Sequence, residues 1–422
     1  MSRKPAQKST IAFAFDIDGV LVRGKEPLPG ASETIRLLQR ARIPFIFLTN
    51  GGGLTEKDHA AKTSARLGVD IDPDQFVQSH SPFHGLVPKY KNKRILVIGG
   101  EGNQIRHVAE AYGFNDVVTS SDLFVEWNSI HPFPEVTAHH HTAHGRRIPD
   151  IRTREIAAIL VWSSSRDWCM DLQVMHDLLL GKLQENPPEL YLSNPNFDWS
   201  TSHEYKRLAQ GALRECLASL FRFSTKGEVE FKYTTVGKPT RITFRWGEKT
   251  MVEYRDKTWE ILNTEGDSRS EEPPPIRTVY MIGDNPDSDI AGAKQYESQI
   301  GAVWKSILVE TGVYQAGTTP SHKPTHHAKD VAEAVRMALD IEGYSSTGVR
   351  VCMKVYHNKE GDDHKEGHVN IGDGDNNRKG HALQDRTNTA DSIEAILPRF
   401  GKLKLPARCL LVEAEDDPAR KP

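Results

Sequence analysis

The sequence predicts an α/β protein in which parallel β-sheets are covered by helices on both faces. Short, nearly continuous apolar segments alternate with stretches of helical character along most of the chain. Apolar runs without polar alternation are typical of strands that are buried on both faces. When helices separate such strands, the result is a doubly wound parallel sheet. The expected strands are Ile11–Phe15, Phe45–Leu48, Lys93–Ile98, Ile156–Val161, Leu190–Leu192, Thr278–Ile282 and Ala302–Trp304.

The first helix is expected at Ala31–Arg42, between the first two strands. Thr34, Ile35 and Leu38 recur there at helical spacing and would form one buried face. Pro44 then separates this helix from the second strand. Helical stretches follow most of the later strands in the same way.

Size and composition limit the classes of function. The chain has 422 residues, enough for two or three domains. Its 54 basic and 57 acidic residues leave a net charge of only −3, which argues against binding to nucleic acid or to a membrane surface. The 4 cysteines have no paired spacing, so we expect neither a disulfide framework nor a thiolate metal site. No apolar run approaches the roughly 20 residues that span a bilayer. A soluble protein of a reducing compartment is expected.

Three stretches depart from the alternating pattern. Residues 128–150 contain a histidine run, which permits transition-metal binding, but a flexible insertion is the preferred interpretation because Thr, Ala and Gly beside it offer no supporting ligands. Residues 263–275 end in three prolines and are expected to form an exposed loop. Residues 344–422 are polar and are expected to be largely disordered.

Two aspartates follow the first expected strand, in the sequence Asp16-Ile17-Asp18-Gly19. Carboxylates this close together repel each other unless a cation or a proton separates them. Carboxylate oxygens are ligands that suit Mg²⁺, and Gly19 permits a tight turn where a side chain would clash. An ordinary turn at the end of a strand is the alternative explanation.

A second polar segment, Thr49-Asn50-Gly51 with two further glycines, follows the strand Phe45–Leu48. A hydroxyl, an amide and three glycines at the start of a helix expose backbone N–H groups that can bind an anion such as phosphate. The alternative is a glycine-rich turn followed by Thr55 as a helix cap.

Lys238 and two more aspartates complete the set of candidate residues. Lys238 lies between Gly237 and Pro239, where its ammonium could neutralise a carboxylate and a phosphoryl oxygen; a solvated lysine is the alternative. Asp284 stands at the tip of the strand Thr278–Ile282, and Asp289 follows at the first turn of a helix. Helix capping would explain one of the three aspartates of this segment, Asp284, Asp287 and Asp289, but not all three.

These segments share a position at the carboxyl end of an expected strand or at the start of a helix. In an open parallel sheet, ligands bind beyond the carboxyl ends of the strands. We therefore expect the loops to converge on one crevice. Each motif alone is a weak signal, and their fixed order along the chain is a strong one.

In this order the motifs resemble those of the haloacid dehalogenase superfamily of phosphotransferases, and within it subfamily IIA. Inside that subfamily the chain is most similar to the branch named for the cat eye syndrome critical region. The resemblance implies a Rossmann-like core formed by residues 1–86 and 236–343, with a large α/β cap inserted at residues 87–235. The matching motifs are Asp16-x-Asp18-Gly19-Val20, Leu28-Pro29-Gly30-Ala31, Leu48-Thr49-Asn50, Gly237-Lys238-Pro239 and Gly283-Asp284 with Asp289.

The resemblance implies an enzyme, a hydrolase that cleaves phosphoric monoesters. Asp16 would be the nucleophile that forms an aspartyl-phosphate. Asp18 would protonate the leaving alcohol and then act as base for the hydrolytic water. Lys238 would offset the charge on Asp16 and on the transferring phosphoryl group.

The resemblance also implies a Mg²⁺ cofactor and a phosphate site. The metal would be held by the Asp16 carboxylate, the Asp18 backbone carbonyl and Asp284, with Asp289 as a ligand through water or as support. The residues that would bind the substrate are Thr49, Asn50 and Gly51 after the second strand, Lys238, and Asn194 in the loop Ser193-Asn194-Pro195-Asn196-Phe197.

A small phosphorylated metabolite is the expected substrate, and a homodimer that pairs through the cap is the expected assembly. Several cap residues could contact the leaving group, although core packing is the more common use of a tryptophan; these are Trp162, Arg166, Trp168 and Trp199. We expect a cytoplasmic protein because Arg3, Lys4 and Lys8 around Pro5 make a poor targeting helix, with the mitochondrion as the alternative.

Two other functions stay open at this point. One is a binding or assembly protein that kept the fold and lost useful turnover, which the filled catalytic positions disfavour. The other is a phosphatase or phosphotransferase that acts on a phospholipid-related headgroup.

Overall fold

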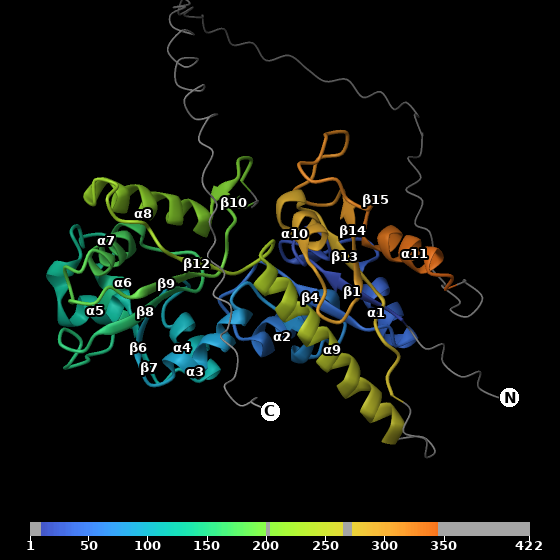
Figure 1. The fold of residues 1–422 in the computed structure, drawn as a ribbon, viewed down its shortest axis with the longest axis horizontal. Helices are drawn as coiled ribbons and strands as arrows, with labels where there is room; N and C mark the ends of the chain where they lie inside the picture. Colours follow the sequence, from blue (N-terminus) through green and yellow to red (C-terminus); the bar gives the residue numbers. More distant parts are fainter. Residues whose placement is uncertain (1–9, 200–202, 265–271, 345–422) are drawn as a thin grey trace, which may run out of the picture. The chain divides into compact units, whose positions relative to one another are not determined.

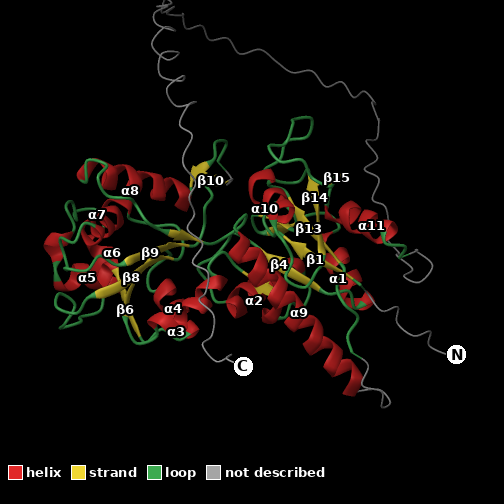
Figure 2. Cartoon of the chain, in the orientation of Figure 1, coloured by secondary structure: helices red, strands yellow, loops and turns green. Residues whose placement is uncertain are grey.

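The computed structural model of the protein describes residues 10–199, 203–264 and 272–344. Within them the chain forms two parallel sheets with helices packed on them (Figures 1 and 2), so the predicted α/β fold class is confirmed. The expected disordered tail lies outside the described residues apart from Tyr344, and so does the central part of the expected loop at 263–275.

The first sheet has six parallel strands in the order β15-β14-β13-β1-β4-β5. Because β13 and β4 both pair with β1, the two halves of the sequence meet in the centre of this sheet. The strands are β1 (Ile11–Phe15), β4 (Phe45–Leu48), β5 (Phe76–Val77), β13 (Thr278–Gly283), β14 (Val303–Val309) and β15 (His326–Ala328).

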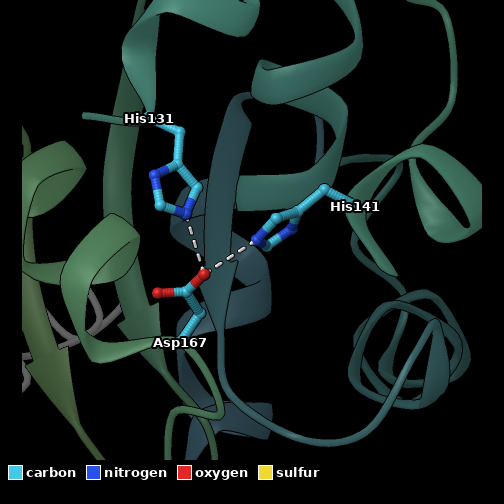
Figure 3. A group of neighbouring side chains, drawn as sticks. All are labelled: His131, His141 and Asp167. Atoms are coloured by element: carbon cyan, nitrogen blue, oxygen red, sulfur yellow. Dashed lines mark hydrogen bonds and ion pairs between the residues drawn. The ribbon is translucent and has the colours of Figure 1, made fainter. Parts of the chain in front are cut away.

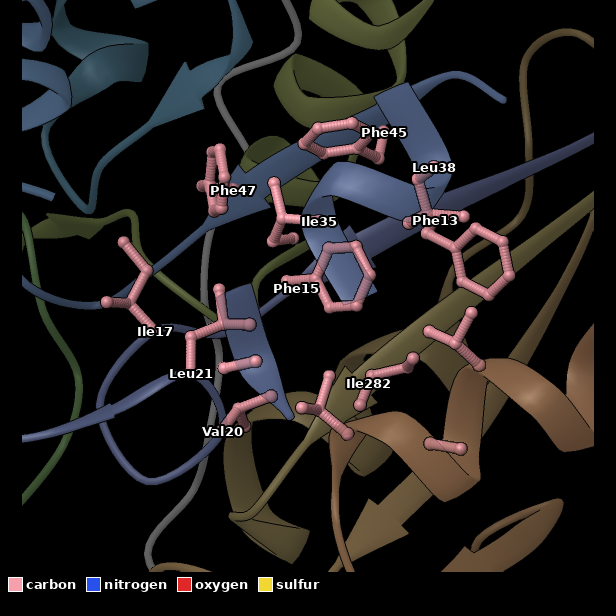
Figure 4. Close-up of a cluster of buried hydrophobic side chains, with 14 of the residues drawn as sticks. Phe13, Phe15, Ile17, Val20, Leu21, Ile35, Leu38, Phe45, Phe47 and Ile282 are labelled. Atoms are coloured by element: carbon pink, nitrogen blue, oxygen red, sulfur yellow. The ribbon is translucent and has the colours of Figure 1, made fainter. Parts of the chain in front are cut away.

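The side chains of β1 explain why both faces of this sheet are covered. Phe13 and Phe15 point to one face, where Figure 4 shows them packed among Ile35, Leu38 and other apolar side chains. Ala12 belongs to the cluster on the opposite face. Helices α1, α2 and α11 contribute to the first cluster, and α9 and α10 contribute to the second. Their bounds are α1 (Ala31–Ala41), α2 (Glu56–Leu67), α9 (Arg241–Thr264), α10 (Ala291–Gln295) and α11 (Val331–Ile341).

The second sheet has five parallel strands in the order β12-β9-β8-β6-β7 and is also covered on both faces. Its strands are β6 (Arg94–Ile98), β7 (Asp116–Thr119), β8 (Ile156–Val161), β9 (Glu189–Leu192) and β12 (Thr234–Thr235). The helices in this part of the chain are α3 (Val87–Tyr90), α4 (Gln104–Tyr112), α5 (Ser120–Glu126), α6 (Ala138–His144), α7 (Trp168–Leu179) and α8 (Gln210–Ser224). The boundaries that we predicted between core and cap stay a prediction.

Short elements connect these parts. Two antiparallel hairpins are formed by β2 (Val22–Arg23) with β3 (Glu26–Pro27), and by β10 (Asp198–Trp199) with β11 (Arg207–Leu208). Three short 3₁₀-helices in the described part of the chain are η1 (Pro73–Gln75), η2 (Ser81–Leu86) and η3 (Asn128–Ile130), and η4 (Pro286–Ile290) is a short π-helix. No helix among the described residues combines the length and the apolar character needed to cross a membrane.

Most of the expected strands match the observed ones closely, and Ile11–Phe15, Phe45–Leu48 and Ile156–Val161 match in every residue. The strand expected at Ala302–Trp304 overlaps only the beginning of β14. Four strands of the two sheets were missed, namely β5, β7, β12 and β15. Each has only two to four residues, and all four lie at edges of their sheets, where short strands are common.

The histidine-containing segment at 128–150 differs from the flexible insertion that we expected. It forms η3 and α6, and the side chain of His141 is buried. The ordering partners come from residues outside the segment, including Asp167, and a sequence window around the histidines could not show them.

Candidate active site

Three neighbouring strands of the first sheet end at the same edge. β13, β1 and β4 are adjacent and parallel, so their carboxyl ends lie together. Asp16 directly follows β1, Thr49 directly follows β4, and Asp284 directly follows β13. The fold therefore brings the expected acidic and hydroxyl groups to one place, as the sequence order of the motifs indicated.

Three of the predicted aspartates form one cluster with Lys238. Oxygen atoms of Asp16, Asp284 and Asp289 all lie within 4.8 Å of one another. The Lys238 Nζ is 2.7 Å from Asp16 Oδ1 and 2.6 Å from Asp289 Oδ1. Lys238 and all three carboxylates are buried. A side chain at Gly283 would collide with Asp289, so the glycine allows this carboxylate to approach the end of β13.

Burial and mutual repulsion strongly perturb this acidic cluster. Burial and the nearby charges of Asp16 and Asp289 raise the pKa of the Asp284 carboxyl well above its usual range. Burial also raises the pKa of Asp289, to about 6, against the opposing effect of Lys238. Burial alone would lower the pKa of the Lys238 ammonium, but Asp16 and Asp289 outweigh it and raise that pKa.

The charge balance of the cluster fits a divalent cation. Three carboxylates face a single ammonium, which leaves an excess of negative charge in a buried place. Buried carboxylates without a balancing cation bind protons instead, and this is the direction in which Asp284 and Asp289 are shifted. Three oxygen ligands at one point are the donor set of a hard metal such as Mg²⁺.

Asp18 lies beside this cluster and does not belong to the group of described residues whose ligand atoms lie within 4.8 Å. Its side chain is exposed. Surrounding protein atoms and the Asp16 charge raise the pKa of the Asp18 carboxyl, and solvent access limits the size of that shift. A carboxyl that holds its proton more tightly than usual, beside the predicted nucleophile Asp16, suits the predicted role of general acid.

Thr49 and Asn50 order the loop after β4. Thr49 is buried, and its Oγ1 accepts a hydrogen bond from the Gly51 amide at 3.0 Å. Asn50 binds the backbone of Lys238 twice: its Oδ1 accepts from the Lys238 N–H at 2.7 Å, and its Nδ2 donates to the Lys238 carbonyl at 2.8 Å. The Asn50 side chain therefore holds the backbone of Lys238 in place, and among the described residues the Asn50 N–H makes no hydrogen bond.

The loop at 193–197 reaches the same residues. Asn194 Nδ2 donates to the Asn50 carbonyl at 3.1 Å, and Asn50 Nδ2 also lies 3.2 Å from Asn196 Oδ1. The structure thus brings Asn194 to the candidate site. All nine predicted site residues lie in or beside this edge, but their catalytic and binding roles stay predictions.

Comparison with known proteins agrees with this arrangement. Residues 13–115 match the family model described as haloacid dehalogenase-like hydrolase, and residues 235–334 match a second model described as HAD-hydrolase-like. The mitochondrial hydrolase YKR070W of Saccharomyces cerevisiae is 37% identical over 351 residues, which cover 78% of this chain and 96% of that protein. The chain belongs to the haloacid dehalogenase-like hydrolases. The predicted superfamily and the prediction of a hydrolase of the phosphatase type are confirmed.

Two further similarities extend this result. A cardiolipin synthase (CMP-forming)/mitochondrial hydrolase fusion protein of Schizosaccharomyces pombe is 35% identical over 340 residues, 78% of this chain and 53% of that protein. Among solved structures, the p-nitrophenyl phosphatase from Archaeoglobus fulgidus has a TM-score of 0.51 and 16% identity, and the alignment covers 77% of this chain and 98% of that one. At that identity the match shows the fold alone. The branch within the superfamily stays a prediction.

Within this hydrolase the candidate leaving-group contacts do not form one group. Trp162 is fully buried in an apolar cluster beside the second sheet, which is the core packing that we gave as the more common use of a tryptophan. Trp168 packs against another apolar cluster. Arg166 donates to the carbonyl of Ser164, and Trp199 is exposed on β10.

A second group of potential metal ligands lies beside the second sheet (Figure 3). His131 Nε2 and His141 Nε2 are 3.0 Å and 3.1 Å from the same oxygen, Asp167 Oδ2. The Phe133 N–H donates to His131 Nδ1 at 3.1 Å, so that nitrogen carries no proton. The Nε2 of a neutral His131 must then carry the proton, and it donates to Asp167 instead of offering a lone pair to a metal.

Hydrogen bonds satisfy this second group without a cation. Burial alone would raise the pKa of Asp167, but hydrogen bonds from the Met170 amide, Thr137, His141 and His131 outweigh it and lower that pKa. Burial lowers the pKa of the His141 imidazole. In this arrangement the residues do not fit a metal ion.

Sequence reasoning missed the polar segment Gln78–Ser81, which lies beneath the loop after β4. Its contacts include the Ser79 N–H bond to the Gly51 carbonyl at 3.2 Å and the Gly53 N–H bond to His80 Nε2 at 3.1 Å. A signal was present, since four polar residues directly follow the apolar pair Phe76-Val77. That pair was too short to be recognised as a strand.

Proposed function

We propose that this hydrolase is a Mg²⁺-dependent phosphatase that cleaves a small phosphomonoester through an aspartyl-phosphate intermediate. The observation that carries the proposal is the buried group formed by Asp16, Asp284, Asp289 and Lys238 at the carboxyl edge of the first sheet. A nucleophilic carboxylate held by a lysine, with two more acids beside it, meets the needs of phosphoryl transfer, which depends on positioning and charge neutralisation.

In the first half of the reaction, a carboxylate oxygen of Asp16 attacks phosphorus and the bond from phosphorus to the leaving oxygen breaks. The Lys238 ammonium, 2.7 Å from Asp16 Oδ1, holds the nucleophile in place and offsets charge on the phosphoryl group. Asp18 gives its proton to the leaving alcohol. Thr49 and the backbone N–H groups of Asn50 and Gly51 bind phosphoryl oxygens, once the Gly51 N–H exchanges its bond to Thr49 for one to the ligand.

In the second half, Asp18 takes a proton from a water molecule that attacks the phosphorus. The bond between phosphorus and Asp16 breaks, and free phosphate and the original carboxylate result. Asp16, Asp284, Asp289 and the Asp18 carbonyl would hold Mg²⁺, which would supply positive charge to the transferring group.

The substrate proposed first is a small phosphorylated metabolite. A phospholipid-related headgroup is the second candidate, favoured by the relative whose name joins a cardiolipin synthase to a mitochondrial hydrolase. The names of both sequence relatives also favour the mitochondrial location over the cytoplasm. A homodimer through the cap stays part of the proposal.

Hydrolysis of p-nitrophenyl phosphate tests the proposal directly. We expect activity that requires added Mg²⁺ and that falls at least about a thousandfold in Asp16→Asn, because the nucleophile is lost. Thermal unfolding of the variant shows whether the fold is kept. Wild-type protein without Mg²⁺-dependent activity would instead support the binding or assembly protein. If the wild type is active, a screen of phosphorylated metabolites together with lipid headgroups separates the two substrate classes.

A further inference from the structure

The glycine loop, defined as residues 51–53 after β4, is hydrogen-bonded to the segment Gln78–Ser81. Consecutive residues of that segment each bind the loop or the residues that follow it. The bonds are Gln78 Nε2 to the Leu54 carbonyl at 2.9 Å, Ser79 N–H to the Gly51 carbonyl at 3.2 Å, His80 Nε2 to the Gly53 N–H at 3.1 Å, and Ser81 Oγ to Glu56 Oε1 at 2.6 Å.

His80 is the centre of this contact, and the direction of each of its hydrogen bonds is fixed. The Gly53 N–H can only donate, so His80 Nε2 accepts. Burial and the nearby His59 and His84 lower the pKa of His80 to about 3, so the ring is neutral and its proton is on Nδ1. That proton is donated to the Tyr112 hydroxyl at 2.9 Å.

Tyr112 and Glu56 complete what we call the His80 network, which consists of His80, Tyr112, Glu56 and Ser81. The Tyr112 hydroxyl accepts from His80 and donates to Glu56 Oε1, which also accepts from Ser81 Oγ. Glu56 begins α2, three residues after Gly53. The network therefore binds both ends of the short connection from the glycine loop to α2.

The position of His80 explains why the loop is so rich in glycine. A Cβ atom at Gly52 would lie 2.7 Å from His80 Cδ2 and 2.9 Å from Ser79 Oγ, closer than real Cβ atoms approach. Gly53 has a φ of +95°, which side chains rarely adopt. The loop sequence and the buried histidine are complementary, since a residue larger than glycine at 52 would displace the imidazole.

The contacts from the segment Gln78–Ser81 leave two N–H groups at this turn without partners among the described residues, one directly before the glycine loop and one within it. Ser79 holds the Gly51 carbonyl and His80 holds the Gly53 N–H. In the described part of the chain, no hydrogen bond is made by the backbone N–H of Asn50 or of Gly52. Unpaired N–H groups in a rigid, glycine-rich turn form an anion-binding site.

We propose that His80 is a positioning residue of this phosphatase: by accepting the Gly53 N–H, it fixes the glycine loop in the conformation that binds the phosphoryl group. The inference rests on the proposed function, because it assigns the loop to phosphate. His80 touches no substrate atom and acts through the loop. This role requires a hydrogen-bond acceptor for the Gly53 N–H at position 80, and the bond from His80 to the Tyr112 hydroxyl holds that acceptor in place.

The test compares His80→Leu with His80→Gln in the full chain. Leucine fills the space but leaves the Gly53 N–H unpaired, whereas the glutamine oxygen can accept that hydrogen. His131→Leu is the matched control. Like His80, His131 is a buried histidine with hydrogen-bond partners, but its partner is Asp167 and it lies in the group beside the second sheet. The measurements are the affinity for inorganic phosphate in Mg²⁺ by calorimetry, KM and kcat for p-nitrophenyl phosphate, and hydrogen–deuterium exchange of peptides from residues 49–55.

In His80→Leu we expect phosphate affinity to fall about tenfold, equal to about 1.4 kcal/mol. KM for p-nitrophenyl phosphate should rise to a similar degree, and exchange in the peptides from residues 49–55 should increase. His80→Gln should recover most of the phosphate affinity and of the exchange protection. His131→Leu should lower the unfolding temperature while phosphate affinity and exchange of the loop stay at wild-type values.

Unchanged phosphate affinity in His80→Leu would overturn the proposal, and so would an equal loss in His80→Gln, which would mean a purely structural role. A wild-type protein that binds phosphate but hydrolyses nothing refutes the proposed function alone, because the phosphate and exchange measurements still decide the role of His80. Wild-type protein that does not bind phosphate refutes the assignment of the loop itself.

Discussion

The described part of the chain contains two groups of three potential metal ligands, and the two groups differ in whether their charges and hydrogen-bonding atoms are satisfied. At the edge of the first sheet, Asp16, Asp284 and Asp289 share one ammonium, and excess negative charge raises the pKa of two of the acids. Beside the second sheet, burial would raise the pKa of the Asp167 carboxyl, but hydrogen bonds from the Met170 amide, Thr137, His141 and His131 outweigh it and lower that pKa. The number and spacing of ligand atoms are alike in the two groups.

This difference shows that charge balance and proton positions, in addition to ligand distance, decide whether a group can hold a cation. The acidic cluster has oxygen lone pairs and needs positive charge. In the histidine group, the hydrogen bond from Phe133 to His131 Nδ1 places the remaining proton of that ring where a metal would have to bind. In the first three predictions that follow, each substitution changes the acidic edge or the histidine group and leaves the other intact, and the fourth concerns His80, which belongs to neither group.

The largest expected effect is on catalysis at the acidic edge. Asp18→Asn should lower kcat for p-nitrophenyl phosphate by about 100- to 10,000-fold, because the general acid and base is lost. The side chain of Asp18 lies outside the acidic cluster, so Mg²⁺ affinity should change little. Steady-state kinetics and a Mg²⁺ titration by calorimetry measure the two quantities, and a large loss of Mg²⁺ affinity would show that the carboxylate itself is a ligand.

The next effect separates the two groups by their response to metal. Asp284→Asn should raise the Mg²⁺ concentration for half-maximal activity by about tenfold or more, since a ligand charge is removed. Asp167→Asn, the matched change in the histidine group, should leave it unaltered. Activity measured against Mg²⁺ concentration gives both values. A shift in the Asp167 variant as large as that in the Asp284 variant would remove the distinction drawn between the groups.

The histidine group should matter for stability instead. Asp167→Ala removes the cap that accepts from the Met170 amide and leaves His131 and Thr137 without their shared acceptor. We expect the free energy of unfolding to fall by about 2 to 4 kcal/mol, with KM for p-nitrophenyl phosphate unchanged. Urea unfolding and kinetics of the folded variant check this. Near-wild-type stability would mean that the hydrogen bonds of this group contribute little.

The smallest effect is a pH dependence that comes from His80. Its folded pKa of about 3 lies below its unfolded value of 6.5, so the unfolded state takes up the proton first. The stability from this group is complete above pH 6.5 and is lost as the pH falls toward 3, at up to about 1.4 kcal/mol per pH unit.

Urea unfolding of wild type and of His80→Gln at pH 7, 6 and 5 isolates this contribution. The neighbouring groups His59, His84, Tyr112 and Glu56 are present in both proteins, so their titration largely cancels in the difference. The free energy of unfolding of wild type should fall relative to that of His80→Gln as the pH falls from 7 to 5. A difference that is constant over this range would show that His80 is already charged or is accessible to water.

Much of the first sheet and its acidic edge could be predicted from the sequence. The strand Ile11–Phe15 and its two aspartates are contiguous in the chain, and apolar runs that end in polar groups are a local signal. Their meeting with Lys238 and Asp284 followed from the order of the motifs and the geometry of parallel sheets. The partners of these groups within hydrogen-bond distance could not be predicted in the same way.

The features that were missed depend on contacts between distant segments. The bond from Gly53 to His80 joins a loop to a segment that follows a two-residue strand, and no periodicity marks such a strand. The buried His141 is hydrogen-bonded to Asp167, which lies outside the histidine-containing segment at 128–150. Charge balance is likewise a property of the folded cluster, since the sequence shows the acids but not which cation they face.

The most direct test of the central claim is a crystal structure of the protein with Mg²⁺ and beryllium fluoride, which forms a stable mimic of an acyl-phosphate on a nucleophilic carboxylate. We expect the beryllium to be bound to an oxygen of Asp16, the metal to contact Asp16 and Asp284, and no metal to be present at His131 and His141. Beryllium fluoride on another residue, or Mg²⁺ held away from Asp284, would contradict this claim.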